Sequence, residues 1–191
     1  MINSREIWEH ILKELGTISP KIYNSFNKGA NEQEIVYLES ALKTTLPDDF
    51  KSYLSVCNGQ KCKDYEHPFL GYNCLLSIDE MISTWQMMND LFAEEEPIEH
   101  IKENKIKPVY WNQLWIPFSD YEASSRLILD LDPGVNGNYG QVYTLYSGLD
   151  SESDEAVVAQ SFKEFSTKVL QTLKNREFSL EDDILEVSWL A

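Results

Sequence analysis

Few residues in this 191-residue sequence could perform chemistry, and the first to consider is the D-x-D motif Asp130-Leu131-Asp132. Side chains two residues apart in a strand lie on the same face, so this pair could hold a divalent cation for glycosyl or phosphoryl transfer. A metal-dependent transferase would also need a nucleotide site, and the sequence has no recognisable one. We therefore favour a structural role, in which Asp132 orders the turn at Pro133 through an Asx-type hydrogen bond.

The ligand types of a tetrahedral zinc site occur in one set of residues: Cys57, Cys62, His67 and Cys74. Their spacing lacks a close C-x-x-C pair, and Cys57 falls on the buried face of an expected helix. Buried thiols are therefore the better interpretation. The other two histidines, His10 and His100, are expected at the surface.

Common catalytic signatures are absent: there is no G-x-S-x-G, no H-E-x-x-H and no P-loop lysine. The glycine-rich segment from Gly134 to Gly140 follows a strand, but Gln141 begins another β-like run rather than a helix. No helix N-terminus is then available to receive a phosphate, and a hairpin connection is favoured. The sequence thus predicts no catalytic residue, no cofactor and no metal ligand.

Trp111 and Trp115 allow a different kind of site. They are four apart in an expected strand and could form an aromatic platform for a ligand. Residues of this type more often fill the core beneath a helix, and we prefer that interpretation.

The elements that would position these residues can be read from hydrophobic spacing and capping residues. Helices are expected from Asn3 to Gly16, Asn31 to Leu46, Pro47 to Gly59, Ser77 to Glu94 and Ser161 to Leu173, with a loop from Pro20 to Gly29. Strands are expected from Trp111 to Phe118, Leu127 to Leu131, Val142 to Tyr146 and Ala156 to Ala159.

This order of elements predicts an α+β fold, with a central, mostly antiparallel sheet covered by helices, a helical N-terminal region and a C-terminal helix. Residues 1–175 are expected to form a single domain, and residues 176–191 an acidic extension that packs on it or follows it. The Trp115 strand should lie with the strands at 127–131 and 141–146.

The charge of the chain restricts its partners. The formal net charge is −16, from 32 acidic and 16 basic residues, in a composition that is 42% hydrophobic and 12% aromatic. Such a chain is globular but disfavours nucleic acid and anionic membranes, and it would attract a basic protein. The charge could also serve solubility alone.

The cellular location is expected to be the cytoplasm. The N-terminal residues MINSREIWEH contain no secretory signal, and no apolar run approaches the length that spans a bilayer. Three cysteines, an odd number of thiols in such a chain, fit a reducing compartment.

Two groups of motifs resemble the SUKH superfamily. The first is Leu46-Pro47-Asp48-Asp49-Phe50, followed by Tyr53 and Asn58-Gly59-Gln60. The second, a W-x-P…L-D-x-x-P…G-Q-V pattern, is formed by Trp115-Ile116-Pro117-Phe118, Leu129 to Pro133, and Gly140-Gln141-Val142. Trp8 and the helix that begins at Ser161 also fit. The chain departs from the family at Ala123-Ser124-Ser125-Arg126, where a glycine-containing segment is usual.

The resemblance implies an α+β protein with no catalytic residues, whose shared motifs are structural. Many bacterial members are immunity proteins that neutralise nuclease or deaminase toxins, and fungal relatives regulate cell-wall glucan synthesis. We therefore expect a non-catalytic binding module, most simply an immunity protein with a basic toxin as its partner. A regulatory or scaffold role is the alternative, and a transferase using Asp130 and Asp132 is a more remote one.

Acidic loops on a rigid scaffold are the expected contact surface, because loops can vary without damage to the core. The candidate partner-binding residues are Glu94, Glu95, Glu96, Asp150, Glu152, Asp154 and Glu155. A merely solvated acidic rim is the alternative for each of them.

Overall fold

The computed structural model describes residues 3–62, 65–92, 103–146 and 156–190 and has an α+β fold, as expected. The five expected helices are α1 (Ser4–Ile18), α3 (Glu32–Leu42), α4 (Asp48–Leu54), α5 (Ile78–Leu91) and α6 (Phe162–Asn175). Reciprocal capping boxes begin three of them, formed by Asn3 with Glu6, Asn31 with Glu34 and Ser77 with Glu80. These local hydrogen bonds confirm the helix starts inferred from the sequence.

The segment after the first helix was wrongly expected to be a loop. It contains α2 (Pro20–Ser25), and α1 continues past Gly16 to Ile18. The side chain of Ser19 caps α2 by accepting the N–H of Ile22, while Pro20 occupies a position where no backbone donor is needed. The buried side chain of Ile22 then anchors this short helix to the core.

The main sheet has four antiparallel strands in the order β2 (Trp115–Pro117), β4 (Ser125–Asp130), β5 (Gln141–Tyr146) and β6 (Val157–Ala159). The Trp115 strand pairs with β4, as predicted, and lies at the edge of the sheet. The expected strand from Trp111 to Phe118 is shorter, because Asn112 forms a turn that accepts the N–H groups of Leu114 and Trp115.

After β2 the chain leaves the main sheet. Residues Ser119–Asp120 form β3, which pairs with β1 (Cys74–Leu75) in a separate two-stranded sheet. The N-terminal half of the chain is thereby attached to the strands of the C-terminal half.

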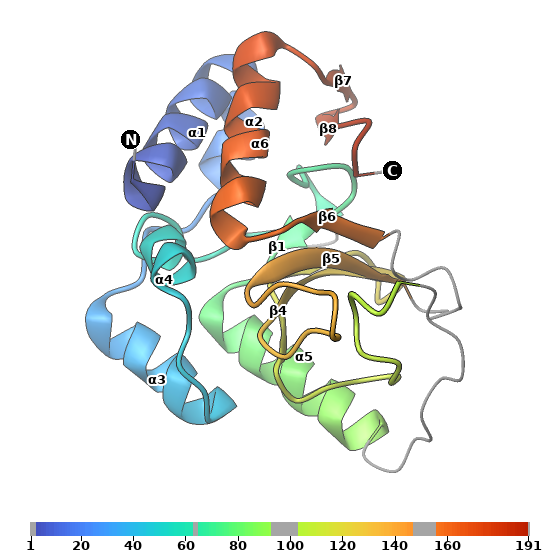
Figure 1. The fold of residues 1–191 in the computed structure, drawn as a ribbon. Helices are drawn as coiled ribbons and strands as arrows, with labels where there is room; N and C mark the ends of the chain where they lie inside the picture. The colour runs from blue at the N-terminus through green and yellow to red at the C-terminus, as the bar shows by residue number, and fades with distance from the viewer. Residues whose placement is uncertain (1–2, 63–64, 93–102, 147–155, 191) are drawn as a thin grey trace.

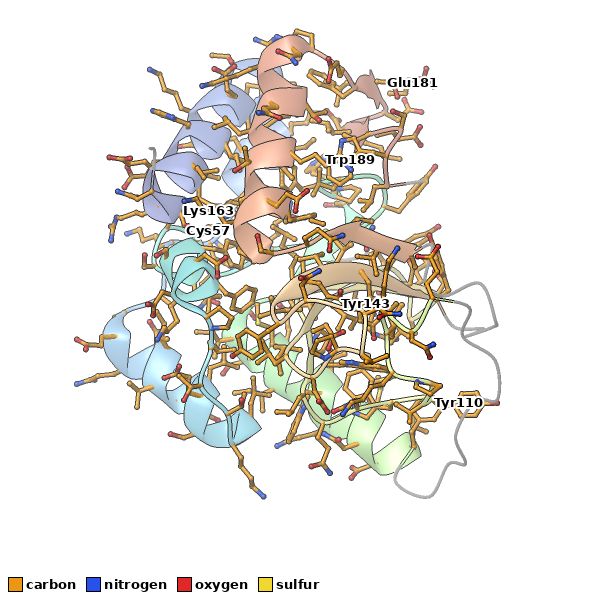
Figure 2. All side chains as sticks on the ribbon, viewed as in Figure 1. Cys57, Tyr110, Tyr143, Lys163, Glu181 and Trp189 are labelled. Carbon is orange, nitrogen blue, oxygen red and sulfur yellow. A yellow bond between two sulfur atoms is a disulfide. The ribbon has the colours of Figure 1, made fainter. Side chains whose placement is uncertain are left out.

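Helices cover both faces of the main sheet (Figure 1). Leu127 and Leu129 of β4 face α1 and α6, which lie side by side. Ile128 of β4 faces the opposite way and packs with Met88 of α5. Tyr143 of β5, which stands opposite Ile128 in the register, belongs to the same cluster (Figure 2). None of the helices in the described ranges has the length and apolar character that crossing a bilayer requires.

The end of the chain packs on this body as a hairpin, with β7 (Ser179–Glu181) antiparallel to β8 (Ile184–Glu186). Leu185 is fully buried, and its carbonyl oxygen accepts the N–H of Gly71 at 2.6 Å. Trp189 lies beside α6, where its Nε1 donates to Oγ1 of Thr172 at 2.9 Å (Figure 2). The acidic extension therefore forms one wall of the surface described below.

Candidate functional site

The two aspartates of the D-x-D motif have separate structural partners. Asp130 is fully buried. Its Oδ1 accepts a hydrogen bond from the N–H of Asp132 at 3.0 Å, and its Oδ2 accepts one from Nε2 of Gln141 at 2.8 Å. Asp132 is partly exposed, pairs with the ammonium of Lys107 and accepts Nδ2 of Asn112 at 2.8 Å. The Asx-type turn is therefore made by Asp130, and the expectation that Asp132 makes it was wrong.

This arrangement argues against a shared cation at the motif. Both oxygens of Asp130 accept hydrogen bonds from the chain itself, and the charge of Asp132 is balanced by Lys107. Among the residues that the structure describes, no cluster of three or more His, Cys, Asp or Glu could hold a metal ion. The geometry thus favours the structural interpretation of the motif over the transferase alternative.

The two carboxyl groups differ in acidity for a physical reason. Burial raises the pKa of Asp130 to about 6, against the opposing effect of its hydrogen bonds from Gln141 and the Asp132 backbone. Burial also acts to raise the pKa of Asp132, but the hydrogen bonds and charge supplied by Lys107 and Asn112 outweigh it and lower that pKa. Asp130 therefore stabilises the fold best in its neutral form.

The buried Asp130 predicts a specific pH dependence of stability. The folded chain retains this proton up to about pH 6, whereas the unfolded chain releases it near 3.8, so stability is lost as the pH rises through that window. At about 1.4 kcal/mol per pKa unit the loss is about 3 kcal/mol. Because Asp130→Asn cannot ionise, its unfolding free energy relative to the unsubstituted chain should rise by about that amount between pH 4 and 7.

Urea unfolding across this pH range measures the difference directly. The exposed Asp182→Asn variant is the control and should follow the unsubstituted chain at every pH. A constant difference between Asp130→Asn and the unsubstituted chain would contradict the prediction.

The cysteines do not form the zinc set considered above. Cys62 and Cys74 form a disulfide, with Cα atoms 5.9 Å apart, and Cys57 is a fully buried free thiol. Burial raises the pKa of the Cys57 thiol well above its ordinary value, which keeps it protonated and unreactive. The expectation of three reduced thiols was wrong, so the cysteines do not support a reducing compartment.

The two tryptophans considered as a ligand platform belong to the packed interior. The Trp115 side chain is fully buried, and its ring meets that of Trp111 edge-on with centroids 6.0 Å apart. Trp111 is partly buried and donates its Nε1 to Oδ1 of Asn89 at 3.0 Å. The core interpretation is correct for Trp115, and Trp111 lies outside any strand.

The predicted partner-binding residues lie outside the described part of the chain. They are Glu94, Glu95, Glu96, Asp150, Glu152, Asp154 and Glu155. Their role as a contact surface stays a prediction. His100, which was expected at the surface, lies outside the described residues as well.

The structure instead presents a groove that the sequence did not reveal. It has a volume of about 780 Å³ and lies between the C-terminal hairpin, the segment 70–73 and the ends of β4 and β5. Tyr72, Tyr121, Tyr146 and Phe178 contribute its aromatic lining. These residues come from separate segments with no common spacing, so only the folded chain brings them together.

A sequence profile of the SMI1/KNR4 family (SUKH-1) matches residues 29–168 of this chain. The chain belongs to the SMI1/KNR4 family. Its relatives include the glucan synthesis regulatory protein of Neurospora crassa, 21% identical over 94% of this chain and 40% of the relative. The cell wall assembly regulator SMI1 of Saccharomyces cerevisiae is 21% identical over 92% of this chain and 41% of the relative. The cell wall biosynthesis/cell cycle regulator smi1 of Schizosaccharomyces pombe is 25% identical over 93% and 38%.

The segment Asn58-Gly59-Gln60, which resembles a SUKH superfamily motif, holds distant backbone segments together. Oδ1 of Asn58 accepts the N–H of Ile78, at the start of α5, at 2.8 Å. Gly59 has a φ of +68°, and a Cβ there would collide with the backbone of Leu76. The side chain of Gln60 accepts the N–H of Leu75 at 3.0 Å.

Residues of the second group of SUKH-like motifs likewise connect two segments, the neighbouring strands β4 and β5 of the main sheet. Gln141 stands opposite Asp130 in the β4–β5 register and bonds to its carboxyl group. Gly140 adopts a φ of +78° and donates its N–H to the Asp130 carbonyl at 2.7 Å, which closes the hairpin. The family motifs among the described residues are therefore structural, and they leave the binding surface to be found elsewhere.

Proposed function

We propose that this SUKH-1 chain is a non-catalytic protein-binding module that acts as an immunity protein, neutralising a basic bacterial toxin of the nuclease or deaminase class. The proposal rests on the burial and the hydrogen-bond partners of the motif side chains. Asp130, Gln141 and Gln60 are buried and bonded to the chain's own groups, so they support a scaffold and do not face a substrate.

The charge of the chain supports a basic protein as the partner. A nuclease must present positive charge to bind phosphate, so an inhibitor with a net charge of −16 gains both faster encounter and selectivity. The inhibitor needs no chemistry of its own if it covers the active site of the toxin.

A second candidate is a regulator of cell-wall assembly, and the names of the relatives favour it. The chain spans about 40% of the length of these curated relatives. In this role the same scaffold would bind a protein of the glucan-synthesis machinery in place of a toxin.

Co-expression with a toxin encoded beside this chain distinguishes the two candidates. Cells that express the toxin should survive only when this chain is also present, and the purified pair should form a 1:1 complex by isothermal titration calorimetry. Death of the cells despite soluble expression of both proteins would contradict the immunity function and favour the regulatory one.

The acidic residues predicted to contact the partner give this proposal a kinetic test. Charge reversal to lysine at Glu94, Glu95 and Glu96 should slow association with the toxin, because favourable long-range attraction is replaced by repulsion. The same reversal at Asp150, Glu152, Asp154 and Glu155 should act likewise. Stopped-flow measurements should show about a tenfold slower association at 20 mM salt, diminishing at 300 mM. Association that is unchanged at every salt concentration would place the contact surface elsewhere.

A further inference from the structure

The groove beside the C-terminal hairpin has a floor of stacked tyrosines. The rings of Tyr72 and Tyr121 lie nearly parallel, 24° apart, with centroids 5.0 Å apart. Tyr65 meets Tyr121 edge-on and donates its hydroxyl to Oδ2 of Asp120 at 2.7 Å, which restrains the Tyr121 ring. The tyrosine floor is thus held in place before any ligand arrives.

Two of the aromatic side chains in the groove are exposed to solvent. Tyr72 is 44% exposed and Tyr146, at the end of β5, is 47% exposed, although both line a concave surface. Exposed tyrosines in a concave site are typical of protein interfaces, because the ring adds contact area at a low cost in conformational entropy.

Carboxylates without basic partners flank this aromatic floor. Glu177 follows α6, Glu186 ends β8, and both are exposed groove residues. Within the described part of the chain neither forms an ion pair with a lysine or arginine, and no basic residue lines the groove. The groove therefore offers negative charge next to open aromatic faces.

An arginine side chain can interact favourably with both the exposed aromatic rings and the carboxylates. A guanidinium group stacks on an aromatic face and forms two parallel hydrogen bonds with a carboxylate. The groove is concave and open to solvent, with residues of the hairpin on one side and the ends of β4 and β5 on the other, so a continuous chain segment could lie along it and present successive side chains.

We propose that this groove binds an extended, arginine-containing segment of the partner protein, with guanidinium groups placed between the Tyr72 and Tyr146 rings and the Glu177 and Glu186 carboxylates. The inference rests on the proposed protein-binding function and names the surface and the partner chemistry that serve it. The groove would bind the partner in addition to the acidic residues predicted above to contact it.

Fluorescence polarisation with a labelled 12-residue peptide, in which arginine alternates with serine, tests the groove in the full chain. The double variant Glu177→Gln/Glu186→Gln should weaken binding about tenfold, and Tyr72→Ser/Tyr146→Ser by a similar factor. The Tyr72→Phe/Tyr146→Phe variant retains the aromatic faces and should bind as the unsubstituted chain does. A matched peptide with glutamate at each arginine position should not bind.

The overall negative charge requires a matched control, for which Glu32→Gln/Asp79→Asn removes the same charge from exposed positions on α3 and α5. If this control weakens binding as much as Glu177→Gln/Glu186→Gln does, the attraction belongs to the whole surface and the groove proposal is overturned. A chain that dimerises in sedimentation, and becomes monomeric in the groove variants, would also overturn it by making a second copy the occupant.

Failure of the groove and failure of the immunity function give different results. If both groove variants protect cells from the toxin as well as the unsubstituted chain does, the groove proposal is overturned while the proposed function stands. If the unsubstituted chain gives no protection but keeps its groove-dependent preference for the arginine peptide, the toxin assignment is wrong and the groove proposal stands.

Discussion

Replacement of Phe162 by alanine should destabilise the protein more than any change at its surface, by about 3–5 kcal/mol. The Phe162 ring is buried at the start of α6 and lies within 6.2 Å, centroid to centroid, of several other aromatic rings. These rings are those of Trp8, Phe50, Tyr53, Phe118 and Phe165. The large cavity left by alanine would loosen contacts to α1, to α4 and to Phe118, which follows β2.

Chemical denaturation measures this loss, with Tyr37→Ala as the control. Tyr37 lies on α3 and is 55% exposed, so its removal should change the unfolding free energy by less than about 0.5 kcal/mol. A cost below 1 kcal/mol for Phe162→Ala would mean that the aromatic cluster does not form the cooperative core inferred from its packing.

Replacement of Arg126 by methionine should cost about 3–5 kcal/mol, because it leaves a carboxylate without its cation in a largely buried place. Arg126 is only 6% exposed, and its Nε lies 2.8 Å from Oδ1 of Asp120, whose side chain is 17% exposed. The two atoms are close but not aligned as a hydrogen bond, so the attraction is mainly Coulombic. The ion pair joins β4 to β3 and supports the tyrosine floor through Tyr65.

A double variant separates the ion pair from the packing of the arginine stem. Asp120→Asn in the Arg126→Met background removes the unpaired charge and should restore at least half of the lost stability, as measured by urea unfolding. Equal destabilisation of the single and double variants would instead show that packing of the Arg126 side chain accounts for the loss.

The helix starts and the β4–β5 hairpin were predictable from the sequence because they depend on neighbours in the chain. Asn3, Asn31 and Ser77 each bond to a residue three positions later, so the pattern is visible without knowledge of the fold. The glycine-rich connection ending at Gly140 is similarly local, and the observed register pairs Asp130 with Gln141 across it. The motifs that resemble the SUKH superfamily also relate segments that are distant in the sequence, because they occur along the chain in the order expected for that superfamily.

Other features depend on contacts between distant segments, which residue types alone do not specify. The pairing of β1 with β3 joins residues 74–75 to 119–120, and the disulfide depends on how Cys62 and Cys74 approach each other in space. The Asx-type turn was assigned to Asp132 instead of Asp130 because D-x-D spacing does not show which carboxyl group will be buried.

The sequence by itself determined the α+β class, the main caps and the strongly acidic character of this protein, since these follow from composition and from interactions between near neighbours. Its motifs also resembled those of the SUKH superfamily, which indicated the family. The tertiary structure alone decided where an exposed aromatic surface would form. The groove joins Tyr72, Tyr121, Tyr146 and the hairpin after α6, which are separated by up to about a hundred residues and share no periodicity. These residues lie close together because β1 pairs with β3 and because the C-terminal hairpin packs against Gly71. Both contacts join segments that are distant in the chain, and neither has a local sequence signature.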